Sequence, residues 1–241
     1  MKSTILFLAM TLLFTHPGTA GEYEKDSFRT DNGKEVTITF IKHGSLMLSF
    51  EGLHIQVDPV TMFADYSTFP KADFILVTHE HGDHLDAKAV EALTKDNTRL
   101  ILNPSSREIL GKGEEIRNGE RLRLTDDIGL DAVPAYNTTP GREQYHPRDR
   151  DNGYILTIDG LRIYIAGDTE DIPEMSALKE IDIAFLPVNQ PYTMTVEQAV
   201  RAAKMFSPKV LYPYHFGDTD VKQIKEQLKE SDIDVRIRKM E

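Results

Sequence analysis

The chain has 241 residues, with 28 basic against 39 acidic side chains and a formal net charge of −11 at neutral pH. An acidic surface is repelled by phosphate backbones and anionic lipid, so nucleic acid is not expected as a partner. The chain has no cysteine, which excludes disulfides, thiolate nucleophiles and sulfur ligands, so any metal must be held by histidine, aspartate, glutamate or asparagine.

The first twenty residues differ from the rest of the chain. Lys2 is their only charged side chain, residues 5–14 are almost wholly apolar, and small residues follow at 18–20. This order is typical of a secretory signal peptide, and the apolar run is shorter than the ~20 residues that span a bilayer. We therefore expect residues 1–20 to be a cleaved signal peptide and the mature protein to be periplasmic or secreted without a stable membrane anchor. An uncleaved anchor or a buried core segment is the alternative.

Short strands and helices alternate along residues 21–241, which we expect to form a single domain. Residues 21–33 are polar and lack periodicity, so we expect a loosely ordered leader there. Apolar patterning and capping residues then predict, in chain order, strands at 36–41, 46–50, 53–57 and 73–77, a helix at 86–93, a strand at 99–102, a helix at 105–110, strands at 121–124, 130–134, 154–158 and 161–166, a helix at 173–179, a strand at 183–188, a helix at 195–205, a strand at 210–214, a helix at 221–229 and a strand at 235–237. Many strands with interspersed helices favour an α/β fold in which helices cover the outer faces of sheets.

One long segment inside this domain has no period. Residues 137–152 are polar and contain two prolines and one glycine. Long irregular loops inside a domain are often functional, so we expect this loop to form a wall of a binding pocket.

Three of the eight histidines fall within six residues, at positions 79, 81 and 84. They follow the apolar run 73–77, which is expected to be a strand buried on both faces. Side chains at 79 and 81 share one side of an extended backbone because the period there is two, whereas Asp83 and His84 turn towards a second point. Imidazole and carboxylate ligands suit zinc, iron or manganese, so the run predicts a metal site.

The run His79-Glu80-His81-Gly82-Asp83-His84 resembles the H-x-H-x-D-H signature of the metallo-β-lactamase superfamily. Further landmarks of that superfamily follow in the expected order, namely Asp58, Ala166-Gly167-Asp168-Thr169 and Tyr214-His215-Phe216-Gly217. Phe40 to Ser45, Tyr164 to Thr169, Leu186-Pro187-Val188 and Tyr192 to Thr195 are similar to the branch that contains ascorbate-6-phosphate lactonase. The resemblance covers roughly residues 36–218.

The resemblance implies a four-layer αββα sandwich that binds one or two zinc ions, with manganese or iron as alternatives. The implied ligands are His79 and His81 for the first ion, Asp83, His84 and His215 for the second, and Asp168 bridging the two. Asp58 is expected to hold the loop that carries the histidines. His43 is expected either to orient a ligand or to make a structural hydrogen bond.

One position departs from the superfamily pattern. The third metal motif usually supplies a histidine after the strand at 130–134, but this chain continues Tyr136-Asn137-Thr138. The first ion is then left with two histidines and the bridging aspartate. Asn137 could offer a weak amide oxygen, or His146 could reach in from the irregular loop; His146 could equally bind substrate or lie in solvent. A single metal ion at the second site is the further alternative.

The function that the resemblance implies is hydrolysis of an ester, lactone, amide or phosphodiester bond of a small molecule by a metal-bound hydroxide. Asp83 would act as the catalytic residue that helps to position this nucleophile. Tyr192, Asn137 and His146 are candidate substrate contacts.

Two other classes of function stay open: an iron-dependent oxidoreductase and a non-catalytic metal or ligand binder. His81 argues against the first, because redox members commonly carry a carboxylate at that position.

Overall fold

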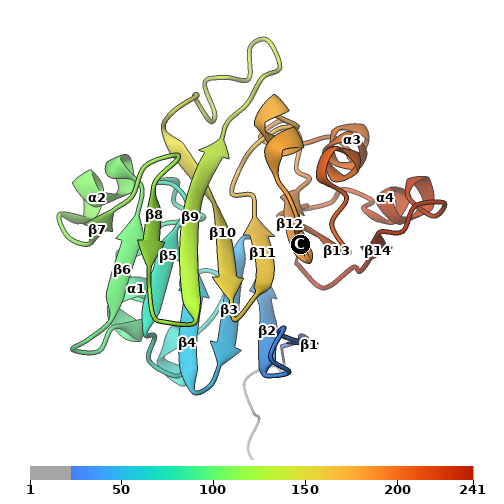
Figure 1. Cartoon of the computed structure of the whole chain (residues 1–241). Coiled ribbons are helices and arrows are strands. Elements are labelled where there is room, and N and C mark those ends of the chain that lie inside the picture. The colour runs from blue at the N-terminus through green and yellow to red at the C-terminus, as the bar shows by residue number, and fades with distance from the viewer. Residues whose placement is uncertain (1–22, 241) are drawn as a thin grey trace, which may run out of the picture.

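Two seven-stranded sheets lie face to face in the computed structural model, which describes residues 23–240 (Figure 1). The first sheet has the order β1 (Lys25–Arg29), β2 (Glu35–Lys42), β3 (Ser45–Phe50), β4 (Leu53–Val57), β5 (Phe74–Val77), β6 (Arg99–Leu102) and β7 (Glu114–Glu115). The second runs in the reverse order from β14 (Asp234–Val235) through β13 (Val210–Tyr214), β12 (Ile183–Pro187), β11 (Leu161–Ile165), β10 (Asp151–Ile158) and β9 (Ile128–Ala135) to β8 (Arg121–Arg123).

The two halves of the chain repeat one topology. Strands β1 to β4 pair antiparallel and β4 to β7 parallel. In the second sheet β8 to β11 pair antiparallel and β11 to β14 parallel. Because the carboxyl ends of parallel strands meet at one edge of a sheet, each half brings the loops after its parallel strands together.

Alternation along the strands separates the two apolar layers. Leu46 and Leu48 of β3 face the core between the sheets, where Leu156 of β10 also lies. Met47 points to the other side and packs in a second apolar cluster with Val90. The period of two therefore buries both faces of the first sheet.

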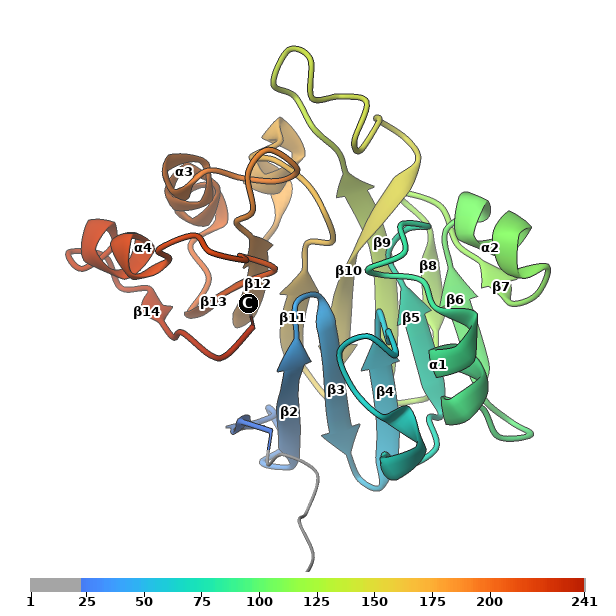
Figure 2. The ribbon, with the colours of Figure 1, turned by 180° about the vertical axis from the view of Figure 1, so that it is seen from behind.

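Helices cover the outer faces (Figures 1 and 2). The first sheet carries α1 (Ala87–Leu93), α2 (Pro104–Leu110) and the short 3₁₀ helix η1 (Tyr66–Thr68), and the second carries η2 (Pro173–Ala177), α3 (Val196–Phe206) and α4 (Lys222–Gln227). Asp86 caps α1 by accepting the Lys88 N–H, and Thr195 with Gln198 forms the expected capping box of α3. The αββα prediction is thus confirmed.

Three predictions of local structure were wrong. Residues 25–29, expected to be a loose leader, form β1. This polar strand is attached to the rest of the protein because Asp26 accepts hydrogen bonds from Arg238 and because Phe28 packs, partly buried, against the core. Strand β10 begins at Asp151, so the irregular loop is shorter than predicted. Residues 173–177 form a 3₁₀ rather than an α-helix.

The expected signal peptide, residues 1–20, lies outside the residues that the structure describes. Between residues 23 and 240 there is no helix of the length and apolarity that crossing a membrane requires.

Candidate metal centre

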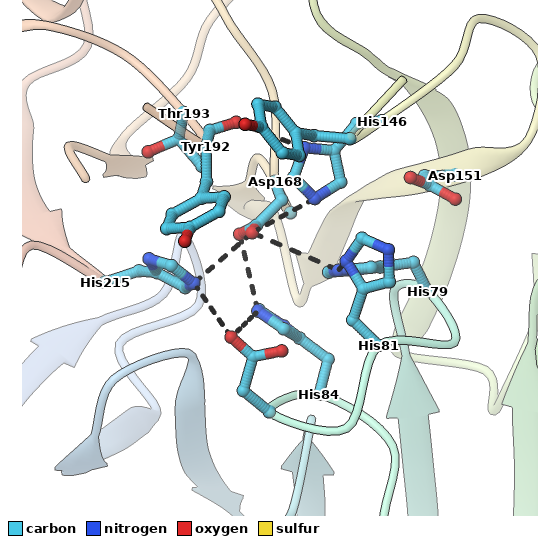
Figure 3. A network of polar contacts seen from close by, with 12 residues as sticks. His79, His81, His84, His146, Asp151, Asp168, Tyr192, Thr193 and His215 are labelled. Atoms are coloured by element: carbon cyan, nitrogen blue, oxygen red, sulfur yellow. Dashed lines mark hydrogen bonds and ion pairs between the residues drawn. The ribbon is translucent and has the colours of Figure 1, made fainter. Parts of the chain in front are cut away.

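The predicted ligands meet at the edge of the two sheets where several strands end (Figure 3). The run His79 to His84 follows β5, Asp168 follows β11 and His215 follows β13. His146 comes from the irregular loop between β9 and β10. Both sheets therefore contribute to one cluster.

The first group of side chains is His79, His81 and His146, whose candidate ligand atoms all lie within 4.8 Å of one another. His79 Nε2 and His81 Nδ1 are 3.1 Å apart, as expected for residues on one side of an extended backbone. His146 is only 1% exposed, so it does not lie in solvent. The sequence left open whether His146 reaches the first ion, binds substrate or lies in solvent. The structure places it beside His79 and His81.

The second group is His43, Asp83, His84 and His215, again within 4.8 Å of one another. Asp83 Oδ2 is 3.1 Å from His43 Nε2 and 3.5 Å from His215 Nε2. Burial alone would raise the pKa of Asp83, but its contacts with His215 and His43 hold that pKa well below its usual range. The Asp83 side chain keeps 42% of its surface exposed, so this side of the cluster is open to solvent.

Asp168 lies between the two groups, as Figure 3 shows. Its carboxylate oxygens are 3.3 Å from His146 Nε2, 3.3 Å from His215 Nε2 and 3.4 Å from His84 Nε2. Burial would raise the pKa of Asp168, but the surrounding imidazoles, led by His215 and His84, hold it well below its usual value. A buried carboxylate surrounded by ring nitrogens is an arrangement that can bind a metal ion.

The donor set fits a metal ion. Four buried atoms that face the centre have no hydrogen-bond partner among residues 23–240, namely His84 Nε2, His146 Nε2, His215 Nε2 and Asp168 Oδ1. Buried polar atoms are almost always paired, so a cluster of unpaired ones indicates a missing partner. Imidazole nitrogens and carboxylate oxygens without sulfur suit zinc, manganese or iron.

Asp58 orients two of the histidines from behind. Its carboxylate accepts hydrogen bonds from His84 Nδ1 at 2.8 Å and from the Thr78 N–H and hydroxyl at 2.7 Å each. The Thr78 hydroxyl is in turn 3.0 Å from His79 Nδ1. A carboxylate at Nδ1 leaves Nε2 of His84 free to face a metal. Through these hydrogen bonds Asp58 joins both ends of the histidine run, as the role expected from the sequence requires.

The backbone is strained around these residues. Asp58, His43 and His215 have positive φ angles of 43°, 57° and 47°. This region is costly for residues other than glycine, and such residues concentrate at functional sites. His43 also accepts the His215 N–H through its carbonyl at 3.1 Å, and the two rings have centroids 3.6 Å apart. His43 is therefore packed against the second group rather than remote from it.

The remaining predicted contacts fall into two kinds. Asn137 is 2% exposed, and its amide bonds the backbone carbonyl of Tyr192 and the ring of His146. The Tyr192 side chain is exposed, and its ring packs edge-on to Tyr145 with centroids 5.1 Å apart. Tyr192 is thus accessible to a substrate, whereas Asn137 lies behind His146.

An ion-pair cluster beside His81 was not predicted. Arg150 bonds both oxygens of Asp151 and Oε1 of Glu80, and its Nη2 lies 3.5 Å from His81 Nε2. Burial raises the pKa of Asp151 to about 6 despite the paired arginine. No motif marks Arg150 or Asp151 in the sequence, because both lie at the end of the segment 137–152, which has no period.

Comparison with known proteins agrees with the geometry. The family described as β-lactamase superfamily domain matches residues 37–215. A metal-dependent hydrolase of Archaeoglobus fulgidus is 30% identical over 221 residues, which cover 84% of this chain and 94% of that protein.

Two solved structures are similar to the whole fold. One, from Parabacteroides distasonis, is of a protein proposed to be a metal-dependent hydrolase. It is 65% identical with a TM-score of 0.90, and the match covers 91% of this chain and 100% of that one. The other, a metallo hydrolase from Ignicoccus hospitalis, is 25% identical with a TM-score of 0.71, covering 84% of this chain and 94% of that one.

Proposed function

Since the chain belongs to the metallo-β-lactamase superfamily and is a metal-dependent hydrolase of that superfamily, we propose that it cleaves an ester, lactone, amide or phosphodiester bond of a small molecule. One observation carries the proposal. Two groups of ligand-type side chains face each other across a single buried carboxylate, Asp168. This arrangement supports a site for two cations that share a bridging ligand.

The proposed ligands follow from the two groups. One ion would be held by His79, His81 and His146. The other would be held by Asp83, His84 and His215, and Asp168 would be shared between them. His146 then takes the place for which Asn137 was the other candidate. Zinc is the proposed metal because three imidazoles form a common zinc site.

A cation bound there would lower the pKa of a coordinated water towards neutrality and would polarise the bond to be cleaved. Asp83, partly exposed and held by His43, faces the open side of the centre and can accept a hydrogen bond from the attacking water. Because its pKa is held well below the usual range, Asp83 would orient the nucleophile rather than store its proton. The buried Asp58 keeps His84 in the matching orientation.

We propose Tyr192 as a substrate contact, since its ring is exposed beside the centre. The net charge of −11 supports a small molecule rather than a nucleic acid as substrate. For the N-terminus, we propose export with cleavage after Ala20, on the strength of the apolar run and the small residues that follow it.

The test combines metal analysis with a substrate panel. Purified protein is expected to contain two zinc ions per chain, and the panel would include esters, lactones, phosphodiesters and β-lactams. His81→Ala, which removes one proposed ligand, should lower the rate on any accepted substrate by at least about a hundredfold. If the wild-type protein and His81→Ala hydrolyse every compound equally slowly, the proposal is wrong. An iron signal in place of zinc would favour redox chemistry.

A further inference from the structure

We propose that Asn137 is a positioning residue of the metal centre. Its carboxamide holds the ring of His146 so that Nε2 faces Asp168, and it ties that ring to the backbone of Tyr192. The inference rests on the proposed function, in which His146 is a metal ligand.

The backbone first brings the two residues together. The Asn137 N–H donates to the His146 carbonyl at 2.8 Å, which closes the base of the irregular loop. Both side chains are buried, at 2% and 1% exposure. The asparagine therefore lies directly behind the histidine ring, on the side away from Asp168.

The orientation of the amide follows from its other partner. Asn137 Nδ2 donates to the Tyr192 carbonyl at 2.7 Å. A carbonyl only accepts, so the NH₂ group must lie on that side and Oδ1 must face His146. Oδ1 is 3.2 Å from His146 Nδ1.

The state of the His146 ring follows in turn. Nδ1 has two acceptors at 3.2 Å, the Asn137 amide oxygen and the Tyr192 carbonyl oxygen. Acceptors on both sides favour a proton on Nδ1, which leaves a lone pair on Nε2. Nε2 is the atom 3.3 Å from Asp168, and it has no hydrogen-bond partner among the residues that the structure describes. The asparagine thus prepares the atom that a cation needs.

The loop does not depend on Asn137 alone. Glu170 accepts the N–H groups of Thr138 and Thr139 at 2.8 and 2.6 Å, and Arg142 bonds the Gln190 side chain. These contacts fix the part of the loop that follows the asparagine. Replacing Asn137 should therefore change the orientation of His146 without releasing the loop.

The experiment measures zinc binding by the full-length chain, after removal of bound metal, in competition with a chromophoric chelator. Asn137→Ala should still bind two zinc ions but hold one of them about 10 to 100-fold more weakly. Asn137→Asp keeps an acceptor at Nδ1 but loses the donor to the Tyr192 carbonyl, so its affinity for that ion should lie between those of Asn137→Ala and the wild type. The visible spectrum of the Co²⁺-loaded protein should change in Asn137→Ala and be partly restored in Asn137→Asp.

Two further variants make the result interpretable. Thr138→Val removes a neighbouring hydrogen bond to Glu170 without touching His146, and it should bind zinc like the wild type. His146→Ala removes the ligand itself and should lose one zinc ion. If Asn137→Ala does not fold, Asn137→Leu keeps the branched shape of the side chain without an acceptor and gives the same comparison.

The outcomes separate this inference from the proposed function. If His146→Ala loses a zinc ion but Asn137→Ala binds zinc and Co²⁺ like the wild type, Asn137 does not position His146, although His146 remains a ligand. If His146→Ala keeps both zinc ions at wild-type affinity, the proposed ligand set is wrong, and this inference fails with it.

Discussion

Asp58 determines which ring nitrogen of His84 is free to face the centre. Metal binding should therefore be sensitive to a replacement of Asp58. One carboxylate oxygen accepts both the Thr78 hydroxyl and His84 Nδ1. In Asp58→Asn the amide NH₂ would face His84 Nδ1 and move the ring proton to Nε2, the atom that faces the centre. Zinc affinity should fall about 10 to 100-fold, measured by chelator competition. Thr78→Val keeps the contact of Asp58 with His84 but removes the hydroxyl at His79 Nδ1, so any loss should fall on the other ion. Equal binding by Asp58→Asn and wild type would contradict this account.

The residues of the centre differ in how far the sequence alone predicts them. The run His79 to His84, Asp168 and His215 each stand in a short motif directly after a strand, so their meeting point follows from strand order. His146 has no such signal, because its place depends on backbone pairing with Asn137 and on the fold of a loop without period. His43 could be assigned only a general orienting role, since its contact with His215 arises from two chain segments far apart in sequence.

At the scale of elements, the turn after β11 requires glycine. Gly167 has a φ angle of +65°, and a Cβ there would lie 2.6 Å from the Asn152 carbonyl oxygen of the neighbouring strand β10. Gly167→Ala should lower the free energy of unfolding by about 2–4 kcal/mol, from left-handed strain and overpacking together. Urea unfolding measures the loss.

Gly82 provides the matched control. It lies inside the histidine run, but a Cβ there meets nothing within 4 Å and its φ is not in the left-handed region. Gly82→Ala should change the free energy of unfolding by no more than about 0.5 kcal/mol. Equal losses in the two variants would mean that the close approach of Gly167 to β10 does not matter.

The strands and helices were largely predictable because their apolar periodicity matches the faces that they bury. Strand β5 is the clearest case: its four residues are all buried, with Leu76 towards the second sheet and Ile75 towards α1. Strand β1 could not be predicted, since its only large apolar residue is Phe28 and Asp26 is held by Arg238, which lies 212 positions away. Apolar periodicity reflects only residues that are near one another in the sequence, so it cannot predict a contact over 212 positions.

At the scale of the whole molecule, Asp26 joins the first strand to the C-terminal segment. It accepts two hydrogen bonds from Arg238, at 2.6 and 2.8 Å, and one from the Tyr212 hydroxyl. Asp26→Asn should lower the free energy of unfolding by about 1–3 kcal/mol at pH 7, measured by urea unfolding. Burial alone would raise the pKa of Asp26, but Arg238 and Tyr212 hold it below its usual value.

The pH dependence of that variant follows from the direction of the shift. A carboxyl whose pKa is lower in the folded state contributes its stability above the unfolded pKa of about 3.9 and loses it as the pH falls through the folded value. The difference between wild type and Asp26→Asn should therefore be constant near neutrality and shrink below about pH 4. A difference that persists at lower pH would show that the Asp26 charge is not what anchors β1.

The metal centre should also stabilise the whole fold, because its proposed ligands come from both sheets. Without a cation, His84 lies among Asp168, Asp58 and Asp83, and these carboxylates outweigh burial and raise its pKa to about 10. A cation bound only by the folded chain adds about 2.7 kcal/mol to the free energy of unfolding when its concentration is a hundred times its dissociation constant.

The melting temperature should therefore fall when a chelator removes zinc and recover when zinc is returned. Mg²⁺, which prefers oxygen ligands and resists dehydration, should give little recovery. His81→Ala should show a smaller response to zinc than the wild type. A melting temperature that is the same with chelator and with zinc would mean that the cluster does not hold a metal across the two sheets.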